Sequence, residues 1–331
     1  MIGRDTDLPG FARAGLTAVL LAAGAAPIHA QNYPSQTIKI VVPFAPGGGV
    51  DVVARVITPK LSEDLGQSVI IENRGGAGGM VGAAAVAQAP PDGYTFLFGT
   101  GSTHGTNPSL YSRISYDPVK DFVPVVLVSS SPLLLVVPTP FPAKSVNDLI
   151  ALARSRPGAL GFASYGTGSI NHLGAELFNS MADIAANHIP YRGSAPALTD
   201  LIAGRVDYMF DGVSTSLGYI QAQTIRALGV AGPHRTPVLP DVPTVAESAL
   251  AGFDTTVWFG LFAPAGTARP IAELVNNKVN AVLASPEVKA SFEKLGIEPV
   301  GGSPQILANR VQAEMQKWAA IVRAKNIHLD Q

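Results

Sequence analysis

The chain has 331 residues, enough to bury a sizeable core and to form about two domains of ordinary size. Only 14% of the residues are charged and the net charge is −1, which argues against binding of nucleic acid or of an anionic membrane surface. The chain contains no cysteine, which excludes disulfides, thiolate metal sites and a lipid-modified cysteine at a signal cleavage point.

The first thirty residues are predicted to be a signal peptide. Arg4 and Arg13 precede the apolar run "AGLTAVLLAAGAAP" at 14–27, which is shorter than the roughly 20 apolar residues that a membrane span needs. We expect cleavage after Ala30; the alternative is a buried N-terminal helix. The mature protein is then exported, is not itself membrane-embedded, and diffuses in the periplasm of a double-membraned bacterium.

From Ile38 onward, short β-rich runs alternate with segments of helical length and period. This alternation predicts an α/β fold with parallel, doubly wound sheets. We predict strands at 38–44, 68–73, 94–100, 160–164, 188–191, 207–212 and 225–230, with helices between them, for example at 145–154, 171–181 and 196–203.

Two long apolar β runs without an intervening helix, at 122–145 and 255–266, interrupt this alternation. They predict two points at which the chain crosses from one sheet to another. Lobe 1 is then discontinuous, at 31–131 and 256–331, and lobe 2 covers 132–255. Two such lobes form a hinged clamp, and ligands of open α/β sheets bind at the carboxyl ends of the strands.

The loop after the first strand, "FAPGGGVD" at 44–51, is the first candidate for ligand contact. Gly47, Gly48 and Gly49 permit close approach of the backbone to a ligand, and the following helix offers unpaired N–H groups to an anion. Phe44 and Asp51 flank these glycines as further candidates. The alternative is that the glycines only turn the chain and Asp51 caps its helix.

Sequence spacing argues against a phosphate ligand. The loop lacks the Gly-Lys-Ser/Thr ending of a P-loop, and no G-x-G-x-x-G occurs in the chain. A second glycine cluster, "RGGAGGMVG" at 74–82, follows the second predicted strand. We interpret it mainly as a site of close backbone packing.

Further candidates follow the third strand and the first strand of lobe 2. Ser102 and Thr103 can donate to a carboxylate oxygen without bringing a charge. In "FASYGTGSINHLGAELF" at 162–178, a strand ends, glycines follow, and a helix begins near a serine that can cap it. This loop supplies the donors that face the first lobe's glycines: Ser164, Gly166, Thr167, Gly168 and Ser169.

Three other polar residues are candidates with a structural alternative. His172 lies in the first turn of the predicted helix, where a backbone-bonded structural role is favoured over ligand contact. Tyr191 could stack on a ligand or bond it. Arg192 could pair with a carboxylate, although an exposed surface arginine is favoured. Asp211 is expected to orient loops or to recognise a polar group.

The sequence offers little support for catalysis. It lacks a G-x-S-x-G nucleophile elbow, and its six histidines never fall into a zinc-ligand spacing such as H-E-x-x-H. We therefore expect no enzyme, no metal and no cofactor. A receptor that captures a small anion by clamp closure explains more of the sequence, and an exported hydrolase is the remote alternative.

At these residues the chain resembles the Bug-type family of periplasmic solute receptors, the substrate-binding subunits of tripartite tricarboxylate transporters. Single motifs of this kind are weak, but eight in one order are specific. They are "YPSQTIKIVVPFAPGGGVDVVAR", "VIIENRGGAGGMVGA", "DGYTFLFGT", "YDPVKDFVPV", "GTGSINHLGAELF", "IPYRGSAPALTDLIAGRVDYMF", "LPDVPTVAE" and "WFGLFAPAGT".

The resemblance implies a type II periplasmic-binding-protein fold with the ligand cleft between its lobes, and a monomer that binds small organic acids. These are di- and tricarboxylates, acidic amino acids or aromatic acids, held largely by backbone groups and bridging waters. It also implies delivery to a two-component membrane permease. Signalling to a sensor partner is the alternative role. The family's ligand loops fall on 44–51, on 166–172 and on 191–194.

Overall fold

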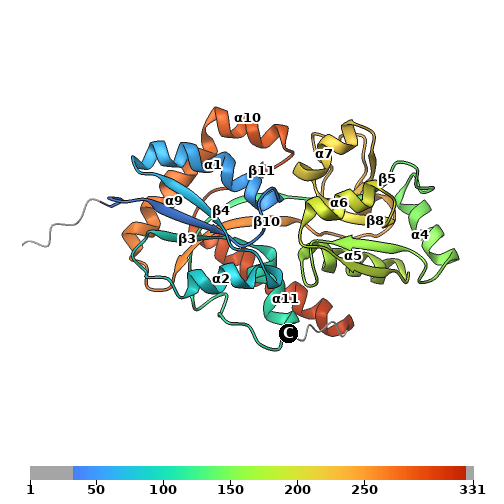
Figure 1. Ribbon diagram of the computed structural model, residues 1–331, viewed down its shortest axis with the longest axis horizontal. Coiled ribbons are helices and arrows are strands. Elements are labelled where there is room, and N and C mark those ends of the chain that lie inside the picture. Colours follow the sequence, from blue (N-terminus) through green and yellow to red (C-terminus); the bar gives the residue numbers. More distant parts are fainter. Residues whose placement is uncertain (1–32, 326–331) are drawn as a thin grey trace, which may run out of the picture.

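The computed structural model describes residues 33–325, so the predicted signal peptide and its cleavage point lie outside the described residues. The described chain forms two α/β lobes that lie side by side along the long axis (Figure 1). Within this range, no helix combines the length and the apolar character needed to cross a membrane.

The first lobe is built on a six-stranded sheet with the order β11-β4-β10-β3-β1-β2. β1 is parallel to both β2 and β3, whereas β10 is antiparallel to β3 and β4. Its elements are β1 (Ile38–Val42), α1 (Gly49–Leu65), β2 (Val69–Asn73), α2 (Met80–Ala87), β3 (Thr95–Thr100), a π-helical turn (Ser102–Thr106), α3 (Asn107–Leu110), β4 (Phe122–Ser131), β10 (Val257–Pro264), α9 (Arg269–Ala284), α10 (Pro286–Lys294), β11 (Glu298–Pro299) and α11 (Pro304–Lys325).

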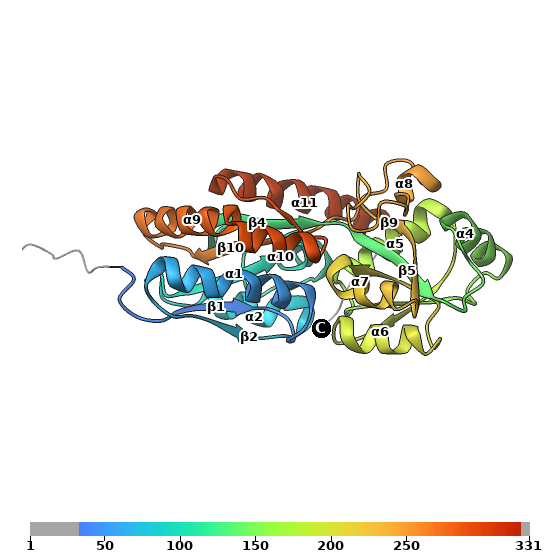
Figure 2. The same cartoon turned by 90° about the horizontal axis from the view of Figure 1, so that it is seen from above.

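Helices cover both faces of this sheet because successive strand residues point to opposite faces. In β1, Ile38, Ile40 and Val42 pack into a core with α1, α9 and α10. Val41, between them, packs on the other face against α2 and α11. Figure 2 shows α9, α10 and α1 above the sheet, with α11 alongside. The lobe is therefore doubly wound, as predicted.

The second lobe repeats this arrangement on a five-stranded sheet with the order β7-β6-β8-β5-β9. Leu133 and Leu135 of β5 pack with α4 and α5 on one face, and Leu134 packs with α6 on the other. Its elements are β5 (Leu133–Pro138), α4 (Val146–Ser155), β6 (Gly161–Ser164), α5 (Ile170–Ala182), β7 (Asn187–Pro190), α6 (Ser194–Ile202), β8 (Tyr208–Gly212), α7 (Val213–Gln221), β9 (Ile225–Val230) and α8 (Val245–Ser248).

The chain crosses between the lobes twice. β4 ends at Ser131 in the first sheet and β5 begins at Leu133 in the second, so that Pro132 alone separates them. The return follows β9, and β10 begins at Val257 in the first sheet. These crossings create the two-lobed clamp that the sequence predicted.

The direction of two strands differs from the expected parallel sheets. β5 is antiparallel to β8 and β9, and β10 is antiparallel to β3 and β4. Each of these strands enters its sheet from the other lobe, toward which the carboxyl ends of the βα strands point. It must therefore run opposite to them. Both sheets are mixed for this reason.

The second glycine cluster serves close packing, as interpreted from the sequence. A Cβ atom at Gly82 would lie 2.8 Å from the Cα atom of Pro43 and 2.8 Å from the carbonyl oxygen of Arg74. A Cβ atom at Gly79 would lie 2.8 Å from Cγ2 of Thr103. A side chain at either position would push α2 away from its neighbours.

Candidate functional site: a cavity lined by helix N-termini

A cavity lies between the two lobes, with an empty volume of about 990 Å³ counted to its open mouth. It is lined by the loops that follow strands in both sheets and by the crossing residues Ser131, Pro132 and Leu133. Small-molecule sites lie preferentially in clefts between domains, so this cavity is the candidate ligand site.

The lobes touch beside this cavity. Ile170 at the start of α5 donates its N–H to the Ser102 hydroxyl across the gap (3.3 Å), and the Thr106 hydroxyl donates to the Gly168 carbonyl (3.0 Å). Elsewhere, a Cβ atom at Gly296 of lobe 1 would lie only 2.4 Å from the Val213 side chain of lobe 2. The cavity wall is therefore continuous from one lobe to the other.

The first lobe presents the N-terminus of α1, and Asp51 holds the loop that leads to it. The Asp51 carboxylate is buried and accepts hydrogen bonds from the N–H of Gly47 (2.9 Å), from Nε of Arg55 (2.8 Å) and from Nδ2 of Asn73 (2.9 Å). Burial raises the pKa of Asp51, but these bonds outweigh burial, so its pKa lies below the ordinary value. The Asp51 carboxylate is therefore ionised, and its hydrogen bonds hold the loop in place.

The three glycines in this loop differ in backbone conformation, in position relative to α1 and in their neighbours. Gly47 has a φ of +84°, a conformation that side chains disfavour. Gly48 is the N-cap of α1 and provides no side-chain cap, so the first N–H groups of the helix remain open. A Cβ atom at Gly49 would lie 3.6 Å from Oγ of Ser214 and 3.9 Å from Cζ of Phe259. A methyl group at Gly49 would therefore make ordinary van der Waals contact with α7 and β10.

The second lobe presents α5 in the same way, and here the cap is a serine. Ser169 accepts a hydrogen bond from the backbone N–H of His172 (3.3 Å), as predicted. Ser169, Ile170 and Asn171 line the cavity. Nδ1 of His172 accepts from the N–H of Gly168 (3.1 Å), so this side chain braces the loop from behind.

His172 also stacks on His188, with 3.8 Å between the ring centroids. Burial lowers the pKa of His172 to about 3, with a smaller contribution from His188, and burial lowers the pKa of His188 to about 4. Both rings are neutral at neutral pH. The histidine pair therefore supports the loop without bringing a positive charge to the cavity.

Two more helices point their N-termini at the cavity. The N-caps of α6 and α7 are Gly193 and Gly212, and neither helix has a side-chain cap. The first turns that follow them line the cavity, including Ser194 and Ser214. Because an uncapped first turn leaves backbone N–H groups without an intrahelical acceptor, both helices can donate to an anion.

Asp211 organises this side of the cavity from beneath. Its buried carboxylate accepts hydrogen bonds from the hydroxyls of Tyr165, Ser194 (3.0 Å), Thr215 (2.8 Å) and Ser216. Burial raises the pKa of Asp211 more than these bonds lower it. Tyr165 and Ser194 line the cavity, so Asp211 fixes the wall without facing the ligand space.

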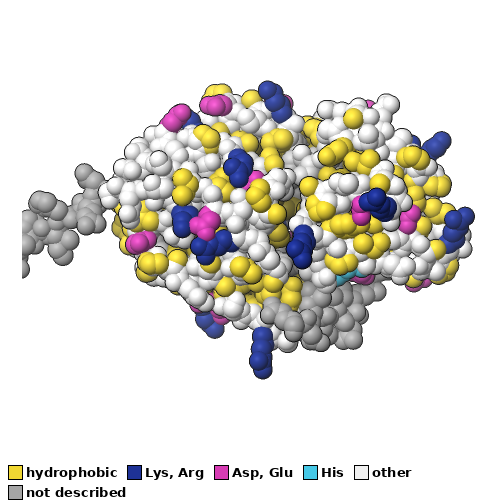
Figure 3. Space-filling model, in the orientation of Figure 1, with side chains coloured by type: hydrophobic (Ala, Val, Ile, Leu, Met, Phe, Trp, Pro, Cys, Tyr) yellow, Lys and Arg dark blue, Asp and Glu magenta, His cyan; other side chains and the backbone are white. Residues whose placement is uncertain are grey.

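Four helix N-termini, those of α1, α5, α6 and α7, thus meet one cavity, where each adds a partial positive charge. Among the described residues that line the cavity, Arg192 is the one charged side chain, and no carboxylate is among them. This distribution favours a negatively charged ligand. Elsewhere, Figure 3 shows charged side chains scattered over both lobes rather than gathered in one basic face.

The structure places the predicted site residues in two groups. Phe44, Gly48, Gly49, Ser102 and Ser169 line the cavity. The other predicted residues do not line the cavity: Gly47, Asp51, Thr103, Ser164, Gly166, Thr167, Gly168, His172, Tyr191 and Asp211.

Ser164, Gly166, Thr167 and Gly168 were expected to present donors to the ligand space but do not line the cavity. Two further placements differ from expectation for a clear reason. The Thr103 hydroxyl, expected to face a ligand, is fully buried and donates to the carbonyl of Thr100 (3.1 Å). The hydroxyl of Tyr191 donates to Asp200 (2.7 Å) rather than facing the cavity. Local hydrogen bonds satisfy both groups.

The sequence interpretation missed several lining residues. Ser214, Phe259 and Ile297 line the cavity and were not named as candidates, whereas Arg192, a named candidate, is exposed and lines it together with Ser194 of the same loop. Ser214 lies two residues after β8, which ends in Gly212, and this pattern is similar to the signal that found the loop at 166–169. Phe259 and Ile297 come from distant segments without such a signal.

Over residues 33–325, no group of three or more His, Asp or Glu side chains is arranged to hold a metal ion. The chemistry of the cavity is therefore that of hydroxyls, backbone amides, apolar side chains and one guanidinium. Such groups bind and orient an anion.

Comparison with known sequences identifies the family. The sequence model of the tripartite tricarboxylate transporter family receptor matches residues 53–327. This chain belongs to that receptor family. This chain is 42% identical over its whole length to a UPF0065 protein encoded between tcbD and tcbE in Pseudomonas sp. strain P51, and the match covers 97% of that protein. It is 39% identical to Protein BugT of Bordetella pertussis, over 90% of this chain and 92% of BugT.

Solved structures agree with this assignment. The receptor matches Rpa4515 of R. palustris, determined with adipate, at a TM-score of 0.87 and 41% identity, over 90% of this chain and all of that one. It matches MatC of Rhodopseudomonas palustris, determined with malate, at a TM-score of 0.83 and 38% identity, over 88% of this chain and all of MatC. It matches the periplasmic binding protein BugD at a TM-score of 0.85 and 33% identity, over 90% of this chain and all of BugD. The fold and family are those of solute-binding receptors, not of enzymes.

Proposed function

We propose that this receptor captures a small carboxylate in the periplasm and delivers it to the two-component permease of a tripartite tricarboxylate transporter. The observation that carries the proposal is the meeting of four helix N-termini at one cavity, three of them with glycine N-caps that leave their N–H donors open. Carboxylates are among the anions that such donors stabilise.

The chemical class of the ligand follows from the cavity wall. Hydroxyls of Ser102, Ser194 and Ser214 supply neutral donors, while Phe44 and Phe259 supply apolar surface for a carbon chain or ring. The structures determined with adipate and with malate belong to relatives that share this fold. We therefore place the ligand among di- and tricarboxylates, acidic amino acids and aromatic acids.

The two crossings between the lobes supply the hinge for capture. Pro132 lies in one crossing and also lines the cavity, so movement of the lobes changes the cavity directly. We propose that the receptor acts as a monomer, closes on the acid, and releases it when the permease opens the clamp.

A thermal-shift screen of the chain from residue 31 tests the function. A panel of organic acids is compared with a neutral sugar and a nucleotide, because a ligand that binds the folded state alone raises the melting temperature. We expect a shift with at least one carboxylate and none with the neutral sugar. A shift with a sugar or nucleotide and with no acid would contradict the proposal.

A further inference from the structure

The C-terminal half of α11 belongs to lobe 1 but reaches lobe 2. Trp318 and Val322 of α11 form a buried apolar cluster with Leu110 of α3 and with Ile170 and Leu173 of α5, which we call the interlobe cluster. Because α5 belongs to lobe 2 and the other two helices to lobe 1, this cluster joins the lobes. Figure 2 shows α11 running along the long axis of the molecule from lobe 1 toward lobe 2. The contact between the lobes thus extends beyond the cavity wall, which of these five residues includes Ile170 alone.

The N-terminal half of α11 is fixed to lobe 1. Leu307 and Val311 pack into the core on one face of the first sheet. A Cβ atom at Gly260 of β10 would lie 2.5 Å from Cδ1 of Leu307, so the helix and the strand are in close contact. Further along α11, Nε1 of Trp318 donates to Oε2 of Glu314 (2.7 Å), which holds the indole in one orientation. The helix therefore moves with lobe 1 and carries Trp318 to α5.

The interlobe cluster lies beside the second crossing of the chain. Nζ of Lys317 donates to the carbonyl of Asp254 in this crossing (2.9 Å). From the other lobe, a Cβ atom at Gly174 of α5 would lie 3.1 Å from Cγ2 of Thr255. Lys317 and Gly174 are sequence neighbours of two cluster residues, so a rotation of lobe 2 about this crossing moves α5 against α11.

Two hydrogen bonds continue the contact toward the cavity. They run from the Ile170 N–H to the Ser102 hydroxyl (3.3 Å) and from the Thr106 hydroxyl to the Gly168 carbonyl (3.0 Å). Every group in these bonds and in the interlobe cluster belongs to the protein. Contacts that exist only when the lobes are together lower the free energy of the closed arrangement, and here the amount does not depend on the ligand.

We propose that the packing of α11 on α5 favours closure of the clamp for every ligand alike. This inference rests on the clamp motion of the proposed function but not on the chemical class of the ligand. The apparent affinity for a ligand falls in proportion to the fraction of protein that is in the binding-competent arrangement. The interlobe cluster then raises every affinity by one common factor, while the cavity wall decides which ligand binds.

Small-angle X-ray scattering of the chain from residue 31 tests the proposal without a ligand. The wild type is compared with Leu173→Ala and Val322→Ala, which truncate the interlobe cluster from lobe 2 and from lobe 1, and neither residue lines the cavity. We expect a larger radius of gyration in both variants, because truncation removes apolar contacts that the closed arrangement makes. Circular dichroism shows that each variant is folded. An unchanged radius of gyration in the folded variants would overturn the proposal, since the cluster would then be a pivot that stays intact when the lobes open.

Calorimetry with adipate and with malate gives the second readout. We expect each variant to bind both acids more weakly by the same factor, roughly three- to tenfold, because the closed fraction falls for both ligands alike. Weakening of one acid alone would contradict a ligand-independent contribution. If the wild type binds neither acid and no other acid of the panel, the proposed function fails, whereas the scattering comparison still decides whether the interlobe cluster favours closure.

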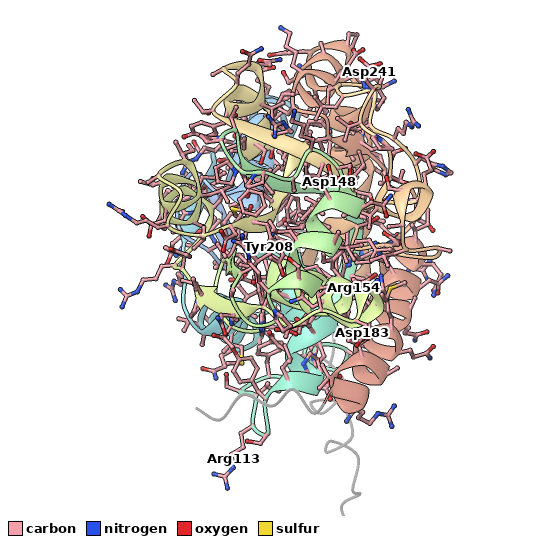
Figure 4. All side chains as sticks on the ribbon, turned by 90° about the vertical axis from the view of Figure 1, so that its right-hand side faces the viewer. Arg113, Asp148, Arg154, Asp183, Tyr208 and Asp241 are labelled. Atoms are coloured by element: carbon pink, nitrogen blue, oxygen red, sulfur yellow. The ribbon has the colours of Figure 1, made fainter. Side chains whose placement is uncertain are left out.

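Val279→Ala is the matched control, since it makes the same truncation on α9, in the buried core of lobe 1 and outside the interlobe cluster. Arg113→Ala is a surface control in the segment after α3, where the side chain points away from the body of the protein (Figure 4). Both should leave the radius of gyration and both affinities at their wild-type values. A change in Val279→Ala equal to that in Val322→Ala would assign the effect to general destabilisation and overturn the proposal.

Discussion

At the scale of single residues, burial keeps the histidines near the cavity uncharged. His104 follows the lining residue Ser102 by two positions, is fully buried and stacks on Phe262 with 3.8 Å between ring centroids. Its Nδ1 lies 2.9 Å from the Thr103 hydroxyl, and its Nε2 has no partner. Burial therefore lowers the pKa of His104 to about 3.

This shift predicts a loss of stability in acid. In the unfolded chain His104 takes up a proton as the pH falls through about 6.5, whereas the folded protein holds it neutral down to about 3. Between these values the unfolded state binds more protons, so acidification lowers the free energy of unfolding by up to about 1.4 kcal/mol per pH unit. His172 and His188 act in the same direction.

His104→Phe isolates this contribution, because phenylalanine keeps the stacking and removes the proton. Urea unfolding at pH 6.5 and at pH 5 should show a smaller loss of stability for the variant than for the wild type. Each protein is its own reference, so a general destabilisation does not affect the comparison. Equal losses would show that His104 is not held neutral.

At the scale of elements, the site depends on where helices begin. The N-terminus of α1 faces that of α7 across a gap in which a Cβ atom at Gly49 would lie 3.6 Å from Oγ of Ser214 and 3.9 Å from Cζ of Phe259. Both helices lack a side-chain cap, which costs each of them some stability but leaves the donors free. These helices therefore give up some stability at their N-termini and gain free N–H donors, which no single side chain provides.

Gly49→Val should fill this gap and lower the affinity for the acid about tenfold or more, because the added methyls occupy the space between the two helix N-termini. Calorimetry with the best acid of the panel measures the change. Gly218→Val is the control, since a Cβ atom there has no neighbour within 4 Å and the residue does not line the cavity. Undiminished affinity in Gly49→Val would remove α1 from the site.

Element positions could be predicted largely from the sequence. The strand runs at 38–44 and 207–212 lie where β1 and β8 form, and Ser169 caps α5 as expected. The directions of β5 and β10 could not be predicted, because hydrophobic periodicity is the same in both directions. Direction is decided by the lobe from which a strand arrives.

The candidate site was predictable where one loop carries the whole signal. Gly48 and Ser169 follow their strands within a few residues and both line the cavity. Asp211 and His172 were recognised as polar groups near these loops, but whether a side chain faces the cavity or braces it depends on partners far along the chain. Ile297 and Phe259 reach the cavity only through the return of the chain to lobe 1.

At the scale of the whole molecule, the two crossings make a clamp whose inner walls both carry helix N-termini. Lobe 1 contributes α1, and lobe 2 contributes α5, α6 and α7. A ligand that bonds both walls stabilises the closed arrangement, because it binds more tightly when the lobes are together. The contacts that recognise the ligand are therefore the same contacts that hold the two lobes closed around it.

A crystal structure of the chain from residue 31 with its tightest-binding acid tests this account most directly. We predict carboxylate oxygens within about 3.2 Å of backbone N–H groups in the first turn of α1 and in that of at least one of α5, α6 and α7. An acid held by one lobe alone, or bound outside the cavity between the lobes, would contradict it.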